Sequence, residues 1–203
     1  MILVINYGTK HLKALLSFLR RHKISYKLRN FRRIELKDIK KSDALILTGG
    51  LGSPVKSKYS EGMNMVNKSK KPILGICLGF QIICNAYSSV IRKTRREDGI
   101  RRIKIKNQDN LFNNCPKIMR VSEHHEFFVE KVGKELEVLA VSKNGIEAVK
   151  HRTKPIYGVQ FHPEVRKDNQ GYKALENFLE LIKKNNYFFI HSSKESASTC
   201  AAT

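Results

Sequence analysis

The chain has little of what marks a membrane or secreted protein. Its longest apolar runs, "ILVI", "ALIL" and "VLAV", are far shorter than the roughly 20 apolar residues that span a bilayer. The start "MILVINYG" has no basic segment followed by a long apolar one, so no signal peptide is expected. We therefore expect a cytoplasmic protein that makes no membrane contact.

Cysteine is also scarce, with four in 203 residues. Cys77, Cys84, Cys115 and Cys200 form no CxxC pair and have no metal-ligand spacing. In a cytosolic chain of this size, that pattern argues against a disulfide framework and against a structural metal site. Each cysteine is therefore either a core residue or a reactive thiol, and its sequence neighbours must decide between the two.

Acidic residues are few, because 18 Asp and Glu face 39 Lys and Arg, and the net charge is +21. The basic residues cluster in 10–33 and 91–106. Such charge attracts polyanions and steers anionic ligands or partners, but neither cluster has the interleaved aromatics of a nucleic-acid motif. We interpret the surplus first as a solvated lysine-rich surface and second as a docking surface for an acidic protein. Specific nucleic-acid binding is not expected.

Short apolar strands alternate with amphipathic helices in the first half of the chain. Residues 2–6, 43–50 and 72–77 predict buried strands. Leucines at helical spacing predict a helix after the first strand, with Thr9 as its N-cap, and another helix is predicted over 79–87. Repeated strand–loop–helix order with doubly buried strands predicts an open, mostly parallel sheet with helices on both faces.

The second half of the chain has a different pattern. Its strands are separated by short turns such as 143–145, which predicts antiparallel additions to the sheet. A last amphipathic helix is predicted over roughly 170–184. We expect one α/β domain over 1–184, followed by a disordered tail of small and polar residues over 185–203.

One cysteine lies between two glycines where a buried strand meets a helix, in Gly75-Ile-Cys77-Leu78-Gly79. Ligands of an open parallel sheet bind at the carboxyl ends of its strands, and Cys77 follows such an end. The glycines permit a sharp turn that holds the thiol out, and the helix N-terminus favours a thiolate. The Leu78 N–H would point to where an oxyanion forms. The alternative is a buried strand cysteine, which we expect of Cys84.

A candidate base for this thiol occurs in "PIYGVQFHPEV", residues 155–165. His162 ends the last buried strand, so it should emerge at the same sheet edge as Cys77. Glu164 follows a proline that stiffens the turn, and it can accept the second imidazole N–H. Alone, His-Pro-Glu would indicate a surface turn. At the matching strand end it predicts a partner for the thiol.

The motifs "GICLGFQ" and "GVQFHPEV", in this order, resemble those of the class I glutamine amidotransferase family. The resemblance extends over residues 1 to about 182. It implies a flavodoxin-like α/β core and a catalytic triad of Cys77, His162 and Glu164. In this family the triad hydrolyses the side-chain amide of glutamine, so L-glutamine is the expected substrate, with glutamate and ammonia as products.

The resemblance also implies which residues bind glutamine. The loop "TGGLGSP" matches the oxyanion loop of the family, which makes the backbones of Gly50 and Leu78 the expected donors. Gly52 and Gln81 match positions that contact the bound glutamine.

The segment "SEHHEFFV" matches a further wall of the glutamine pocket in this family. His125 matches its histidine, whereas His124, Glu126 and Phe127 would contribute mainly backbone. The two histidines could instead be metal ligands, but no Cys or Asp lies at ligand spacing. No metal is therefore expected.

Several segments resemble the GMP synthase branch of the family. They are the opening "ILVINYGTKH", the valine after HPE, "REDGIRRIKI" and "GYKALENF". A stand-alone chain of this length resembles the archaeal-type arrangement, which implies that ammonia passes to a separate ATP-pyrophosphatase subunit for amination of XMP to GMP. Glutamine hydrolysis itself would need no cofactor, and ATP and Mg²⁺ would belong to the partner synthetase.

Other residues differ from that branch and leave alternatives open. Phe127 stands where the branch usually has aspartate, and Leu51 stands where proline is usual. One alternative is a glutaminase subunit of anthranilate or aminodeoxychorismate synthase. Another is a stand-alone hydrolase of γ-glutamyl compounds, and a third is a basic binding protein that keeps the fold without catalysis.

Overall fold

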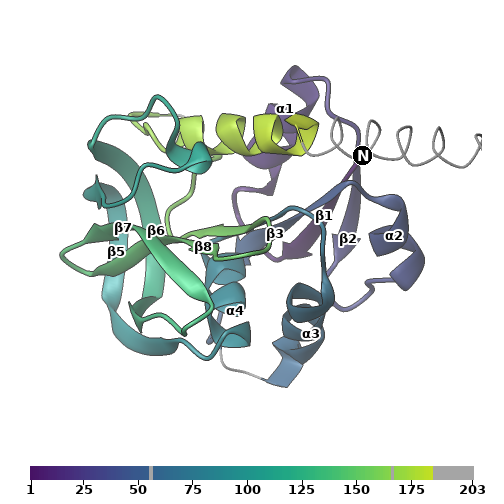
Figure 1. Cartoon of the computed structure of the whole chain (residues 1–203), viewed down its shortest axis with the longest axis horizontal. Coiled ribbons are helices and arrows are strands. Elements are labelled where there is room, and N and C mark those ends of the chain that lie inside the picture. The colour runs from purple at the N-terminus through teal and green to yellow at the C-terminus, as the bar shows by residue number, and fades with distance from the viewer. Residues whose placement is uncertain (55–56, 166, 185–203) are drawn as a thin grey trace, which may run out of the picture.

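The computed structural model describes residues 1–54, 57–165 and 167–184, and the predicted tail over 185–203 lies outside them. Strands and helices alternate in the first half, and antiparallel strands dominate the second (Figure 1). In order, the elements are β1 (Ile2–Tyr7), α1 (Leu12–Arg21), β2 (Tyr26–Asn30), α2 (Leu36–Lys41), β3 (Ala44–Gly50), the 3₁₀ turn η1 (Ser57–Tyr59), α3 (Ser60–Lys68), β4 (Ile73–Ile76), α4 (Leu78–Ala86), β5 (Val90–Ile105), the 3₁₀ turn η2 (Asn110–Phe112), β6 (Ile118–Lys131), β7 (Leu136–Ser142), β8 (Gly145–His151) and β9 (Ile156–Val159). Residues 172–184 form a last helix.

The strands form one sheet in the order β2-β1-β3-β4-β9-β8-β6-β5-β7. The first five in this order pair in parallel. This is the flavodoxin-like order, in which ligands bind outside the carboxyl ends of the strands. The pairing that matters most for the site joins β4 to β9, because these strands are neighbours in space although 80 residues of sequence separate Ile76 from Ile156.

Antiparallel strands extend this sheet, as predicted. β5 and β6 form a long ribbon, and β7 and β8 form a hairpin whose turn contains Lys143 and Asn144. Gly145 closes that turn with a φ of +141°, a backbone conformation open to glycine. β7 pairs with β5 as well as with β8, so the antiparallel strands β5, β6, β8 and β7 form a closed set of pairings.

Helices cover both faces of the sheet, with α1 and the last helix on one side and α3 and α4 on the other (Figure 1). The buried residues of β1 alternate between the two faces, as the period of a strand requires: Ile2 and Val4 pack with α1, and Leu3 and Ile5 with α4. No helix in the described ranges is long and apolar enough to cross a membrane. The predicted fold class is confirmed.

Two local features differ from the sequence prediction. α1 begins after His11 rather than after Thr9, and the Thr9 hydroxyl accepts the His11 backbone N–H at 3.2 Å. The short helix α2 was not predicted. Its buried Asp38 is held at 2.5 Å by both Lys27 and Arg29 of β2, and Ile39 packs against the core, so ion pairs and a single apolar contact fix its position. Charged residues in a short segment give no periodic signal.

Candidate active site

Cys77 occupies a strained turn between β4 and α4. Its φ of +51° and ψ of −104° are sparsely populated for a residue with a side chain, and such strain concentrates at functional sites. The flanking glycines allow the turn to pack tightly. A Cβ on Gly79 would lie 2.2 Å from the carbonyl oxygen of Leu47, and a Cβ on Gly75 would lie 2.6 Å from the Gly79 backbone. The sequence thus forms the sharp strand-to-helix turn expected of GxCxG.

His162 and Glu164 follow β9, the strand beside β4. The Glu164 carboxylate accepts from His162 Nδ1 at 2.9 Å, and both residues are buried. His162 Nε2 is buried and forms no hydrogen bond with any residue that the structure describes. Burial alone would lower the pKa of His162, but the negative charges of Glu164 and then Cys77 outweigh it and hold the pKa well above its ordinary value. The imidazole is therefore fixed on one side and free to exchange a proton on the other.

The imidazole and the thiol side chain meet over Gly49, near the end of β3. A Cβ on Gly49 would lie 2.9 Å from His162 Cε1 and 3.5 Å from Cys77 Cβ. Any side chain at this position would enter the space of the His162 ring. The sequence places Gly49 and Gly50 together at the end of a buried strand, at the edge of the sheet where a ligand binds, but it does not reveal the close approach of the His162 ring to Gly49.

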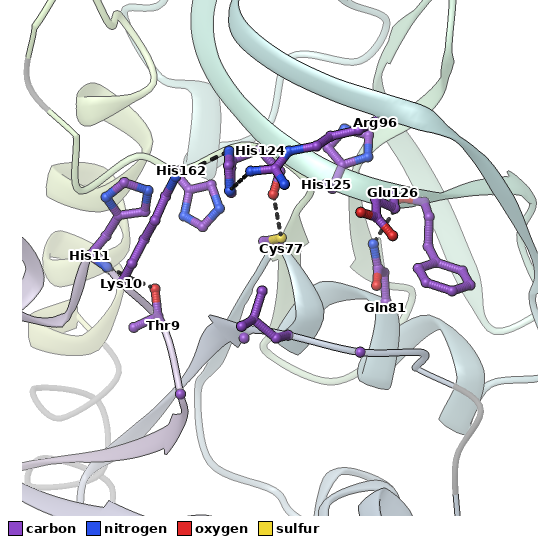
Figure 2. Close-up of a pocket in the computed structure, with 15 residues that line it drawn as sticks. Thr9, Lys10, His11, Cys77, Gln81, Arg96, His124, His125, Glu126 and His162 are labelled. Carbon is purple, nitrogen blue, oxygen red and sulfur yellow. Dashed lines mark hydrogen bonds between the residues drawn. The ribbon is translucent and has the colours of Figure 1, made fainter.

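A cavity of about 180 Å³ opens above Cys77 (Figure 2). Its lining comes from the ends of several strands and from the β5–β6 ribbon. The lining residues are Gly8, Thr9, Lys10, His11, Gly50, Leu51, Gly52, Cys77, Gln81, Arg96, His124, His125, Glu126, Phe127 and His162. The cavity is therefore where the parallel-sheet rule places a ligand.

The candidate oxyanion donors belong to two segments, the start of α4 and the end of β3. Leu78 is the first residue of α4, and the N–H of such a residue has no partner within its helix. Gly50 lines the cavity and forms a bridge with Gly8, and a Cβ there would lie 2.3 Å from the Tyr7 carbonyl oxygen. Gly52 lines the cavity with a φ of +112°.

Gln81 is anchored in the cavity wall by its side-chain amide. Its Nε2 donates to the Phe127 carbonyl at 2.9 Å and to Gln160 Oε1 at 3.0 Å. These two bonds use both of its donors, so only the carbonyl oxygen of this side chain is left to accept from a ligand. Gln81 and Phe127 therefore form a shared wall, with α4 tied to β6.

His125 connects the cavity to a buried group of acids. Its Nε2 lies 3.1 Å from Glu123 Oε2, and Glu147 accepts from the Ser142 hydroxyl at 2.6 Å. Glu123 and Glu147 are both almost fully buried, and each carboxyl group affects the pKa of the other. Burial raises the pKa of Glu123 to about 7, and burial followed by the charge of Glu123 raises the pKa of Glu147 well above its ordinary value. The two carboxyl groups therefore hold protons that exposed acids would lose.

Replacing Glu123 with glutamine should make stability less dependent on pH. The wild-type carboxyl has a higher pKa folded than unfolded, so its stabilising contribution is complete below about pH 4.5 and is lost as pH rises through about 7. Between these limits the wild type should lose about 3 kcal/mol of unfolding free energy relative to Glu123→Gln. Urea unfolding at a series of pH values measures this difference. Parallel curves for the two proteins would contradict it, and the exposed Glu130→Gln is the matched control.

His11 is a further residue that sequence analysis missed. Its ring centroid lies 4.7 Å from that of His162, and both rings line the cavity (Figure 2). Burial and then the neighbouring His162 lower the pKa of His11 to about 4, so its ring stays neutral at physiological pH. The usable signal was its position just after β1, at the same sheet edge as Cys77 and His162.

Charged residues surround His124 at the mouth of the cavity. Lys10 Nζ lies 3.2 Å from His124 Nδ1, Arg96 Nη2 lies 2.8 Å from His124 Nε2, and Asp98 Oδ1 lies 3.1 Å from Nδ1. The His124 carbonyl accepts from the Cys77 thiol at 3.7 Å. Within the described ranges, no three His, Cys, Asp or Glu side chains are grouped as metal ligands would be.

Known proteins are similar to this chain in sequence and in fold. Residues 3–182 match the family described as glutamine amidotransferase class-I. A glutamine-hydrolyzing GMP synthase subunit of Methanococcus aeolicus is 37% identical over 185 residues, which cover 89% of the chain and 97% of that protein. The protein of the same name from Methanocaldococcus jannaschii is 37% identical over 149 residues, which cover 72% of the chain and 78% of that protein.

Solved structures give the same result for the fold. A Thermoplasma acidophilum protein described as a GMP synthase subunit superposes with a TM-score of 0.85 at 25% identity, covering 92% of the chain and 96% of that protein. A glutamine amidotransferase from Thermotoga maritima superposes with a TM-score of 0.73 at 17% identity, covering 91% and 82%. The second likeness bears on the fold alone.

Proposed function

The chain belongs to the class-I glutamine amidotransferase family, and from this premise we propose that Cys77, His162 and Glu164 hydrolyse L-glutamine to glutamate and ammonia. The observation that carries the proposal is the pairing of a strained cysteine turn with a buried histidine whose Nδ1 is held by a carboxylate at 2.9 Å. A thiol nucleophile needs a nearby base, and the base needs an orienting group. These three residues supply all three parts.

The proposed reaction proceeds through a thioester. Cys77 Sγ attacks the side-chain amide carbon of glutamine as a thiolate, its proton having moved to His162 Nε2. The C–N bond then breaks, and His162 returns this proton to the departing nitrogen, which leaves as ammonia. His162 next takes a proton from water, whose oxygen attacks the thioester carbon. Glutamate is released as the thiolate re-forms. Glu164 stabilises the imidazolium throughout.

The proposed binding residues surround this reaction. The backbone N–H groups of Leu78 and Gly50 would stabilise the oxyanion of the tetrahedral intermediate. Gly52, Gln81, His125 and Phe127 would line the glutamine pocket, in agreement with their places around the cavity. Hydrolysis would need no metal or other cofactor, because the thiolate is the nucleophile and the imidazole moves the protons.

The proposed acceptor of the ammonia is XMP, bound to a separate synthetase subunit. Support comes from relatives that match over most of their length and are named as one subunit of GMP synthase. A protein named as one subunit implies another, and that partner would bind ATP and Mg²⁺ to activate XMP. This partner assignment rests on the relatives and not on the geometry of the cavity.

Ammonia release from glutamine should rise strongly when the ATP-pyrophosphatase subunit, XMP and Mg-ATP are added to the purified chain. The reaction should form GMP in proportion to the glutamine consumed. An anthranilate synthase large subunit with chorismate is the matched control partner and should give no stimulation. Stimulation by this control alone would overturn the XMP assignment. If the chain alone releases ammonia rapidly and neither partner increases the rate, the protein would be a stand-alone hydrolase.

A further inference from the structure

Three aromatic rings form a cluster next to the backbone that follows β3. Tyr7 of β1 stacks on Phe31 with ring centroids 5.1 Å apart, and Tyr59 of η1 meets the Tyr7 ring edge-on at 5.6 Å. The Phe31 and Tyr59 rings lie 5.5 Å apart, so each ring contacts the other two. Tyr59 is 1% exposed. Close packing of this kind leaves the Tyr59 ring one orientation and fixes the position of its hydroxyl group.

The two tyrosines of the cluster differ in what their hydroxyl groups contact. The Tyr59 hydroxyl donates to the Leu51 carbonyl at 3.2 Å. The Tyr7 hydroxyl is buried and forms no hydrogen bond with any residue that the structure describes. Leu51 lines the cavity, whereas neither tyrosine is among the lining residues. The Leu51 carbonyl is therefore turned toward a buried side chain outside the cavity wall.

The direction of this carbonyl fixes the direction of the next backbone N–H. The peptide between Leu51 and Gly52 is trans and planar, so its C=O and N–H groups point in opposite directions. Because Tyr59 holds the carbonyl on the side away from the cavity, the Gly52 N–H is directed to the cavity side, where Gly52 lines the wall. Gly52 has a φ of +112°, and glycine would also permit the reverse orientation of this peptide. The hydrogen bond from Tyr59 favours one of the two orientations.

We propose that Tyr59 is a positioning residue, whose hydroxyl holds the peptide between Leu51 and Gly52 so that its N–H faces the cavity as a hydrogen-bond donor. The ligand that receives this bond is glutamine if the proposed function holds, and the inference rests on that function to this extent. Gly50 is held separately by its bridge with Gly8. Loss of the Tyr59 hydroxyl should therefore release the Gly52 N–H, leave the proposed oxyanion donor in place, and weaken binding rather than chemistry.

The test measures kcat and KM for L-glutamine with the full chain and its stimulating partner. Tyr59→Phe should raise KM about tenfold and change kcat by less than about twofold, because a contact made equally to substrate and transition state appears in KM. Tyr7→Phe keeps the ring cluster and removes only a hydroxyl without a described partner, so it should change neither constant. Ile182→Val removes one buried methylene from the core on the other face of the sheet, so it should lower stability and leave KM unchanged.

A wild-type KM in Tyr59→Phe, or an equal rise of KM in Tyr7→Phe or Ile182→Val, would overturn the role of Tyr59. Crystal structures of the wild type and of Tyr59→Phe give a second measurement that needs no turnover. The Leu51 carbonyl should turn away from residue 59 in the variant, and an unchanged direction would also overturn the inference. If the wild type hydrolyses no glutamine with any partner, the proposed function fails instead, and the two crystal structures still decide whether Tyr59 holds this peptide.

Discussion

Cys77→Ala should abolish ammonia release from glutamine, lowering kcat by roughly 10⁴-fold or more. The variant removes the only atom proposed to attack the amide carbon, and no other cysteine of the described chain lines the cavity. Stability should change little, because alanine keeps the Cβ and loses only the sulfur. Release of ammonia from glutamine, followed with and without the synthetase partner, measures the effect.

Cys115→Ala is the matched control for this loss. Cys115 is a second buried thiol, and burial raises its pKa to about 11, so it is a poor nucleophile at neutral pH. This control should keep wild-type turnover. GMP formation from externally added ammonium should also survive in the complex of Cys77→Ala with its partner, because the synthetase itself is unchanged. Full glutamine turnover in Cys77→Ala would refute the assignment of the nucleophile.

The juxtaposition of Cys77 and His162 could be predicted because it depends on a topological rule. Both residues follow buried strands, and the carboxyl ends of parallel strands meet at one edge of a sheet. The rule requires only that Cys77 and His162 lie at the same edge of the sheet, and the structure brings them closer because β4 and β9 are adjacent strands. Glu164 is two residues from His162, so its approach to the ring follows from local sequence alone.

Other parts of the site could not be predicted because the positions of their residues depend on how distant strands pair with one another. Residues 94–96 appear in the sequence as part of a solvated basic run, and only a bulge of β5, opposite Glu126 of β6, brings Arg96 to the cavity. Glu123 and Glu147 belong to different strands and appear as ordinary surface acids. Burial of both arises only when β6 and β8 come together.

The predicted start of the first helix was wrong, because the helix begins after His11 rather than after Thr9. Thr9 has the residue type of an N-cap, but its hydroxyl binds the His11 N–H and the helix begins later. His11 is therefore the residue just before the helix, and its ring packs against the His162 ring. The later helix start leaves Thr9, Lys10 and His11 outside the helix, and all three line the cavity.

Gly49→Ala should lower kcat for glutamine about 100-fold while leaving KM nearly unchanged. The new methyl group would lie 2.9 Å from His162 Cε1, closer than Cβ atoms approach other atoms in proteins. His162 is held at Nδ1 by Glu164, so the ring must tilt about that bond and carry Nε2 away from the thiol. A misplacement of about 1 Å in a proton-transfer group can cost about 100-fold in rate. Steady-state kinetics with the partner complex separates the two constants.

The control for this prediction must carry a strained glycine substitution outside the cavity. Gly99→Ala in the β5–β6 ribbon meets only Arg101 Nη1 at 3.7 Å, but its φ of +93° imposes a backbone cost. It should therefore lower the melting temperature without lowering kcat, whereas Gly49→Ala should lower kcat with a smaller change in melting temperature. Equal activity of Gly49→Ala and wild type would mean that the His162 ring has room to move without leaving the thiol. The contact over Gly49 would then have no part in positioning the base, whose ring is also held at Nδ1 by Glu164.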